Sequence, residues 1–140
     1  ALPIYAGDRL VVDHGGWAAV AVAAPVYPIA LSVFPTTQVA DLPSMPGGQR
    51  DGLAAVLVDV LARLDRYFGQ PLPYMMWVNQ GPRPSSGTSA APGGHWLDIE
   101  IVSPWRAPGV ARYIAAAEVA CGEYFNPLDP RDVARRLREV

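Results

Sequence analysis

Residues 96–102 read Trp96-Leu97-Asp98-Ile99-Glu100-Ile101-Val102, so apolar and polar side chains alternate along them. Successive side chains of a β-strand point to opposite faces, which places Leu97, Ile99 and Ile101 on one face and Asp98 and Glu100 on the other. This alternation predicts a strand with one apolar and one polar face.

Four upstream segments also have strand patterns bounded by turn-forming residues. They are Arg9–Val12, Trp17–Ala23, Ile29–Phe34 and Tyr74–Gln80. Asp13–Gly16 is predicted to form the first turn. The stretch Gly81–Gly94 is rich in Pro, Ser and Gly and is expected to be a mobile loop within a domain.

Three helices complete the predicted fold. Apolar residues recur at i+3 and i+4 spacing from Leu53 to Phe68, with Gly69 as the C-cap. A second helix is predicted from Pro108 to Cys121, closed by Gly122, and a third begins at the N-cap Asp129. Strands followed by helices predict an α+β fold. We expect all 140 residues to form one domain, with an antiparallel sheet of about five strands and helices packed on one face.

The run from Trp17 to Phe34 is uncharged and about as long as a membrane span. Pro25 and Pro28 in its middle would break a helix, and residues 29–34 alternate as a strand does. We therefore interpret the run as two buried strands and expect no membrane association.

Charge and cysteine content narrow the class of protein. The net charge of −2 offers no basic field for nucleic acid. All eleven basic residues are Arg, which excludes mechanisms that need a lysine side chain, such as Schiff-base formation. The single cysteine, Cys121, excludes an internal disulfide, and no charged segment of a signal peptide precedes the apolar run. We expect a cytoplasmic protein.

Nucleophilic catalysis finds no support in the sequence. The two histidines, His14 and His95, lie in no H-x-H motif, and there is no G-x-S-x-G, C-x-x-C or phosphate-binding loop. We therefore assign no catalytic residue to this chain.

Asp98 and Glu100 form the best local signal for a site, because carboxylates at i and i+2 of a strand lie about 6–7 Å apart. Such a pair can bind a metal, hold sugar hydroxyls or share a proton, or it can be a solvated face paired with arginines. Asn79 would join the same surface if its strand pairs with this one.

Glu118 is the second signal, because it lies in the otherwise apolar run Ile114–Cys121. Its carboxylate either turns to solvent or Arg112, or accepts hydrogen bonds from a polar ligand.

Several segments, in order along the chain, resemble galactose-1-phosphate uridylyltransferases. Residues 73–82, Pro-Tyr-Met-Met-Trp-Val-Asn-Gln-Gly-Pro, are similar to a P-Y-M-M-x-W-H-Q-A-P segment of that family. Residues 95–100 resemble its H-W-x-L-H-x-H or H-L-H-x-E strand. Arg112-Tyr113, Ala117-Glu118, Phe125-Asn126-Pro127 and the D-P-x-x-x-A-x-x-L-R ending resemble its C-terminal region.

The resemblance implies the C-terminal half of a two-unit, histidine-triad-like α+β enzyme. The N-terminal half of that family carries an H-P-H motif, whose second histidine receives UMP from UDP-glucose and passes it to galactose 1-phosphate. It also carries the zinc site where one exists. This chain has neither the H-P-H motif nor that zinc site. We therefore expect no cofactor in it, and we expect a partner H-P-H half on a separate chain or segment.

The family's motifs also imply site residues. Arg112, Tyr113, Glu118 and Asn126 match substrate contacts for the hexose 1-phosphate and UDP-sugar, and Asn79, Gln80, His95, Asp98 and Glu100 would support the site. Some members bind a second metal through histidines of these two strands. Here Asn79, Asp98 and Glu100 stand at those positions. Loss of the histidines argues against an iron site and leaves open either a hard cation such as Mg²⁺ or Ca²⁺ or side chains that hold the active-site loop through hydrogen bonds. We assign no metal ligand.

Three hypotheses follow for the whole chain. It is an enzyme half that forms an oligomer with an H-P-H partner, a degenerate non-catalytic binding or interaction domain, or a fragment of a single-chain transferase. The first and third predict activity on mixing with an H-P-H half, and the second predicts none.

Overall fold

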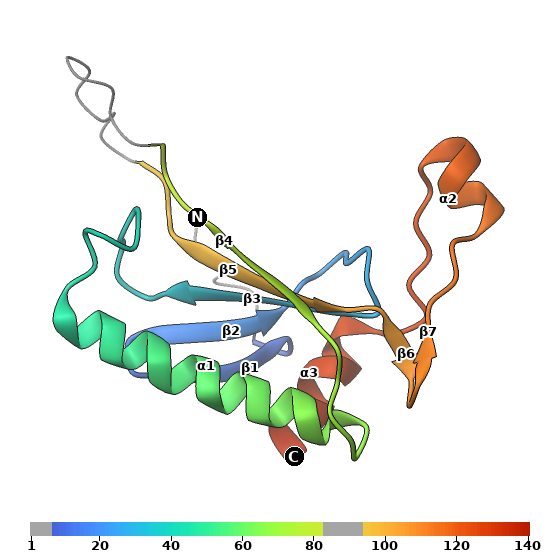
Figure 1. Ribbon diagram of the computed structural model, residues 1–140, viewed down its shortest axis with the longest axis horizontal. Coiled ribbons are helices and arrows are strands. Elements are labelled where there is room, and N and C mark those ends of the chain that lie inside the picture. Colours follow the sequence, from blue (N-terminus) through green and yellow to red (C-terminus); the bar gives the residue numbers. More distant parts are fainter. Residues whose placement is uncertain (1–6, 83–93) are drawn as a thin grey trace.

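The computed structural model describes residues 7–82 and 94–140. Five strands form one antiparallel sheet in the order β1-β2-β3-β5-β4 (Figure 1). They are β1 (Leu10–His14), β2 (Trp17–Ala21), β3 (Ile29–Pro35), β4 (Met75–Asn79) and β5 (Asp98–Ser103). Most of the loop predicted over residues 81–94 lies outside the described residues.

Two long helices cover one face of this sheet (Figure 1). They are α1 (Gly47–Tyr67) and α3 (Pro130–Glu139). The apolar face predicted for residues 97–101 contributes Leu97, Ile99 and Ile101 to the core beneath them, and all three side chains are buried. The predicted α+β class, with a five-stranded antiparallel sheet and helices on one face, is confirmed.

The apolar run from Trp17 to Phe34 folds as the two neighbouring strands β2 and β3, as predicted. None of the helices in the described part of the chain has the length and apolar composition needed to cross a bilayer. Observed strand ends differ from the predicted ones by one or two residues. The turn predicted over Asp13–Gly16 is wrong in its first two residues, because Asp13 and His14 end β1. Gly15 and Gly16 make the turn to β2, and their φ angles of 63° and 77° suit glycine.

The helix predicted from Pro108 to Cys121 is wrong over its first half. Strands β6 (Trp105–Ala107) and β7 (Val110–Ala111) form a hairpin there, and α2 spans only Ala116–Cys121. Pro108 and Gly109 form the turn of this hairpin, and the φ of Gly109 is +69°. Proline followed by glycine at positive φ is a turn signal, which prevailed over the alternative of a proline opening a helix. Gly122 closes α2 as predicted, with a φ of +68°.

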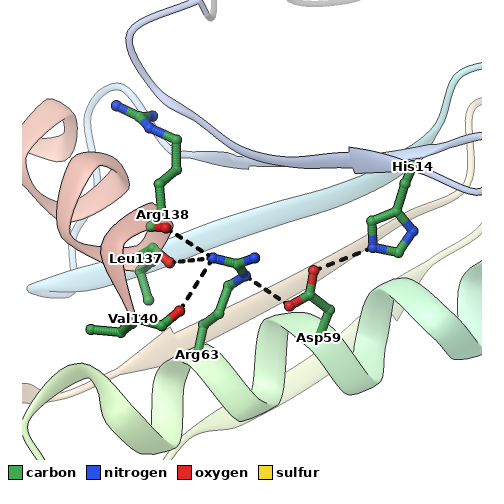
Figure 2. A network of polar contacts seen from close by, with 6 residues as sticks. All are labelled: His14, Asp59, Arg63, Leu137, Arg138 and Val140. Carbon is green, nitrogen blue, oxygen red and sulfur yellow. Dashed lines mark hydrogen bonds and ion pairs between the residues drawn. The ribbon is translucent and has the colours of Figure 1, made fainter.

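A polar network fastens the helices to each other and to β1 (Figure 2). The Arg63 guanidinium of α1 donates hydrogen bonds to the carbonyl oxygens of Leu137 at 2.8 Å and Arg138 at 3.3 Å, at the C-terminal end of α3. It also donates to the Asp59 carboxylate at 2.8 Å, and the other Asp59 oxygen lies 3.3 Å from Nε2 of His14. A cation at the C-terminus of a helix stabilises its unsatisfied carbonyls, so Arg63 caps α3.

Candidate functional site

The predicted site residues fall into two groups at opposite ends of β5. Asn79, Asp98 and Glu100 lie where β4 and β5 meet at the start of β5. The four predicted substrate contacts belong to the segment after β5. Residues 112–127 carry α2 away from the sheet, and we call this segment the α2 arm (Figure 1). The structure does not bring the two groups into contact through any described hydrogen bond.

Glu118 lies in the first turn of α2, and its carboxylate faces the inside of the arm. It accepts hydrogen bonds from the backbone N–H of Ala115 at 3.0 Å and of Phe125 at 3.4 Å, and it pairs with the Arg112 guanidinium. Burial alone would raise the pKa of Glu118, but these backbone donors and Arg112 outweigh burial and lower it. Of the alternatives open for Glu118, the structure has it facing Arg112.

Arg112 and Asn126 also tie the base of the arm to the connection between β2 and β3. Arg112 donates to the carbonyl of Val26 and lies over the ring of Tyr27 at 5.9 Å. The Asn126 amide donates to the carbonyl of Tyr27 at 3.0 Å, and its oxygen accepts from the N–H of Leu128 at 2.9 Å. Both predicted substrate contacts therefore help to position the arm.

A pocket of about 340 Å³ lies at the base of the arm, and all four predicted substrate contacts line it. The pocket is formed by Arg106, Arg112, Tyr113, Ala115, Glu118, Phe125, Asn126 and Pro127. A neighbouring hollow of about 420 Å³ shares Arg112 and Glu118 with it, so this ion pair separates the two spaces. Guanidinium groups beside aromatic rings suit a ligand with both anionic and apolar parts, although the Arg112 guanidinium and the Asn126 amide already donate hydrogen bonds within the protein.

Tyr113 is the most accessible of the four, with 72% of its surface exposed. The guanidinium of Arg106 lies 5.4 Å from the centre of its ring. Arg106 and Tyr27 are pocket residues that sequence reasoning missed as candidates. Arg106 lies in no local pattern that marks a site, and Tyr27 reaches its hollow from the β2–β3 connection, which no local pattern reveals either.

At the other end of β5, the strand of Asn79 pairs with the acidic strand, which is the condition under which Asn79 was expected to join that surface. Asn79 lies opposite Asp98, and its amide nitrogen donates to Asp98 Oδ2 at 3.0 Å and to Glu100 Oε1 at 2.9 Å. A solvated acidic face would pair with arginines. Among the described contacts, the partner of both carboxylates is the Asn79 amide.

Gln80 and His95 lie beside this group and contact the connection between β3 and α1. The Gln80 side-chain oxygen accepts from the N–H of Leu42 at 3.0 Å, and the His95 carbonyl accepts from the Gln38 amide at 3.3 Å. Gly81 packs against His95 so closely that an added Cβ would lie 2.9 Å from the Cβ of His95. These residues fix the backbone on both sides of residues 83–93.

The donor set here does not fit the second metal that some members of the resembled family bind. Imidazoles are absent from the three positions, and the amide nitrogen of Asn79, which cannot coordinate a cation, faces both carboxylates. Within residues 7–82 and 94–140, no group of three or more His, Cys, Asp and Glu side chains is arranged to hold a metal ion.

The sheet and the order of the elements form a histidine-triad-like α+β fold. Solved histidine triad proteins, among them a zinc-bound one from Mycobacterium smegmatis, superimpose with TM-scores of 0.57–0.59 at 13–15% identity and cover 93–94% of this chain. A solved uridylyltransferase superimposes better, with a TM-score of 0.79 and 25% identity over 94% of this chain and 40% of its own.

Sequence comparison makes the relationship more specific, although no protein-family profile matches the chain. A galactose-1-phosphate uridylyltransferase from Thermotoga maritima is 29% identical over 114 residues, and one from Streptomyces lividans is 31% identical over 145. They cover 81% and 96% of this chain. The chain spans only 35–39% of the length of these relatives. It is therefore related to the galactose-1-phosphate uridylyltransferases and corresponds to their C-terminal part.

Proposed function

We propose that this chain forms the hexose-phosphate-binding part of a UDP-glucose–hexose-1-phosphate uridylyltransferase, a nucleotidyltransferase of galactose metabolism. The observation that carries the proposal is the pocket of about 340 Å³, because it gathers Arg112, Tyr113, Glu118 and Asn126 from the arm. The names and sequence similarity of the relatives support the same reaction.

The nucleophile in this proposal comes from an H-P-H segment outside the 140 residues. The two histidines of the chain lie in no such motif. His14 is engaged by Asp59 of α1, and neither histidine lines the pockets beside Arg112 and Glu118. A double displacement through a uridylylated histidine needs an accessible imidazole next to the substrate, so the chain would bind substrate while its partner performs the covalent step.

The exposed edge of the sheet supports such a partner. In the described part of the chain, β4 has a neighbouring strand on one side only. Its residues Met75, Met76, Trp77 and Val78 are 37–45% exposed and carry no charge. Proteins usually protect edge strands with charges or proline, and an unprotected apolar edge favours the addition of another strand. We propose that the H-P-H part docks here.

The proposal is tested with the chain as it occurs in its source. The tagged chain is purified with its bound polypeptide and given UDP-glucose and galactose 1-phosphate. We expect UDP-galactose, together with a uridylyl group on a histidine of the co-purified H-P-H polypeptide. The isolated chain should show no uridylyl adduct by mass spectrometry, and an adduct on it would contradict the division of labour.

Two tyrosines of the arm test the pocket itself. Tyr113→Ala should raise the KM of the complex for galactose 1-phosphate by roughly tenfold, the effect of losing one good ligand contact. Tyr124→Ala is the control, because Tyr124 is also exposed but lines the neighbouring hollow and not this pocket. Equal effects of the two changes would reject the pocket assignment. A complex that forms but has no transferase activity would favour the alternative, a non-catalytic histidine-triad-like interaction domain.

A further inference from the structure

Asn79, Asp98 and Glu100 form a three-residue group across the last two strands of the sheet. All three side chains are half-buried, and they share the face of the sheet opposite the helices. Asp98 and Glu100 would repel each other as neighbouring carboxylates, since like charges on one strand face are unfavourable. The Asn79 amide has two N–H bonds, and it directs one to each carboxylate.

The amide nitrogen stands at the point from which a ligand could reach both carboxylates. Its distances to the two oxygens, 3.0 and 2.9 Å, are those of ordinary hydrogen bonds. A cation between the same oxygens would need Asn79 to turn its carbonyl oxygen inward or to leave, because hard cations bind oxygen and never an amide N–H.

We infer that the Asn79 amide takes the place of a cation between Asp98 and Glu100, so that edge strand β4 is fastened to β5 by hydrogen bonds without a metal. The inference does not depend on the proposed transferase activity. It predicts that the exposed β4 edge keeps its position when divalent cations are removed, whereas a metal-bridged pair of strands would loosen.

Wild-type protein provides the first test. Its melting temperature should be unchanged, within about 1 °C, between EDTA and millimolar Mg²⁺, Ca²⁺, Mn²⁺ or Zn²⁺, and elemental analysis should find no stoichiometric metal. In NMR spectra, the Asn79 side-chain amide signals should not move when Mg²⁺ or Ca²⁺ is added. Bound metal, or a cation-induced rise in melting temperature that Asn79→Ala abolishes, would overturn the inference.

Asn79→Asp provides the converse test, because it replaces two donors with a third carboxylate. In EDTA its melting temperature should fall by about 3–10 °C, as expected for loss of hydrogen bonds and added repulsion. Ca²⁺ or Mn²⁺ should restore at least half of the loss. Gln70→Glu adds the same charge at an exposed position and should respond to neither condition. An Asn79→Asp protein as stable as wild type in EDTA would refute the role of the amide, and the wild-type measurements remain decisive if this variant does not fold.

Discussion

Arg112 and Glu118 are each other's partner within the α2 arm. Only 13% of the Arg112 side chain and 3% of the Glu118 side chain are exposed. Glu118 also accepts from two backbone N–H groups of the arm, so the pair holds the arm together and forms the wall of the pocket. A ligand in the pocket would meet this preformed pair together with the accessible Tyr113.

Glu118→Ala is expected to loosen the arm and leave the sheet intact. The N–H groups of Ala115 and Phe125 lose their acceptor, so their hydrogen exchange should accelerate by roughly tenfold or more. Amides of β3 and β5 should keep their protection. Glu118→Gln retains one acceptor oxygen and should have a smaller effect. Equal acceleration in the sheet and the arm would show that Glu118 acts on the whole fold.

Gly52→Ala should destabilise the protein strongly, although alanine is the better helix former. A Cβ at this position of α1 would lie 2.0 Å from the carbonyl oxygen of Gly15 and 3.1 Å from Cδ1 of Trp17. Because the nearest obstacle is backbone, the helix or the β1–β2 turn must move, at a cost of about 2–4 kcal/mol.

Gly48→Ala, near the start of the same helix, is the matched control, since a Cβ there has nothing within 4 Å. It should be neutral or stabilising by up to about 1 kcal/mol. Urea unfolding of both variants measures the difference, and a Gly52→Ala protein as stable as Gly48→Ala would contradict the close packing of α1 on this turn.

The parts of the fold predicted from sequence are those with strong local periodicity. The alternation at residues 97–101 and the helical stripe from Leu53 to Phe68 each specify an element and its buried face. Asn79 was expected beside Asp98 and Glu100 only if the two strand patterns form neighbouring strands. The structure shows that these strands are neighbours.

The α2 arm was predicted less well because tertiary contacts shape it. Residues 108–115 are compatible with helix by composition, yet the Pro108-Gly109 turn and the contacts of Arg112 and Asn126 with Val26 and Tyr27 hold them extended. Arg112 lies 86 positions from Val26 in the sequence, and Asn126 lies 99 positions from Tyr27. No pattern of neighbouring residues encodes contacts at that separation.

Arg63→Met should lower the free energy of unfolding by about 1–3 kcal/mol. The variant keeps the apolar stem but removes the donors to the Leu137 and Arg138 carbonyls at the end of α3. Arg66→Met removes an exposed arginine three residues further along the same helix and should change stability by less than about 0.5 kcal/mol. Urea titrations compare the two, and similar losses would argue against capping of α3 by Arg63.

Asp59 should make folding more stable at neutral pH than in acid. Burial opposes ionisation of its carboxyl group, but hydrogen bonds from Arg63 and His14 outweigh burial and lower the pKa of Asp59 below its ordinary value. A carboxyl group with a lower pKa in the folded state contributes its full stability above the unfolded pKa, about 3.9, and loses it as the pH falls through the folded pKa. At pH 7, Asp59→Asn should therefore be less stable than wild type by about 1 kcal/mol.

The same comparison below pH 4 should show that difference shrinking, because wild-type Asp59 is then becoming protonated. Asp65→Asn, at an exposed position of the same helix, changes the charge equally and should track wild type across the pH range. Urea unfolding at several pH values gives the two difference curves. If the gap between wild type and Asp59→Asn widened in acid, the ion pair would be destabilising and the network of Figure 2 would not be what fastens α1 to β1.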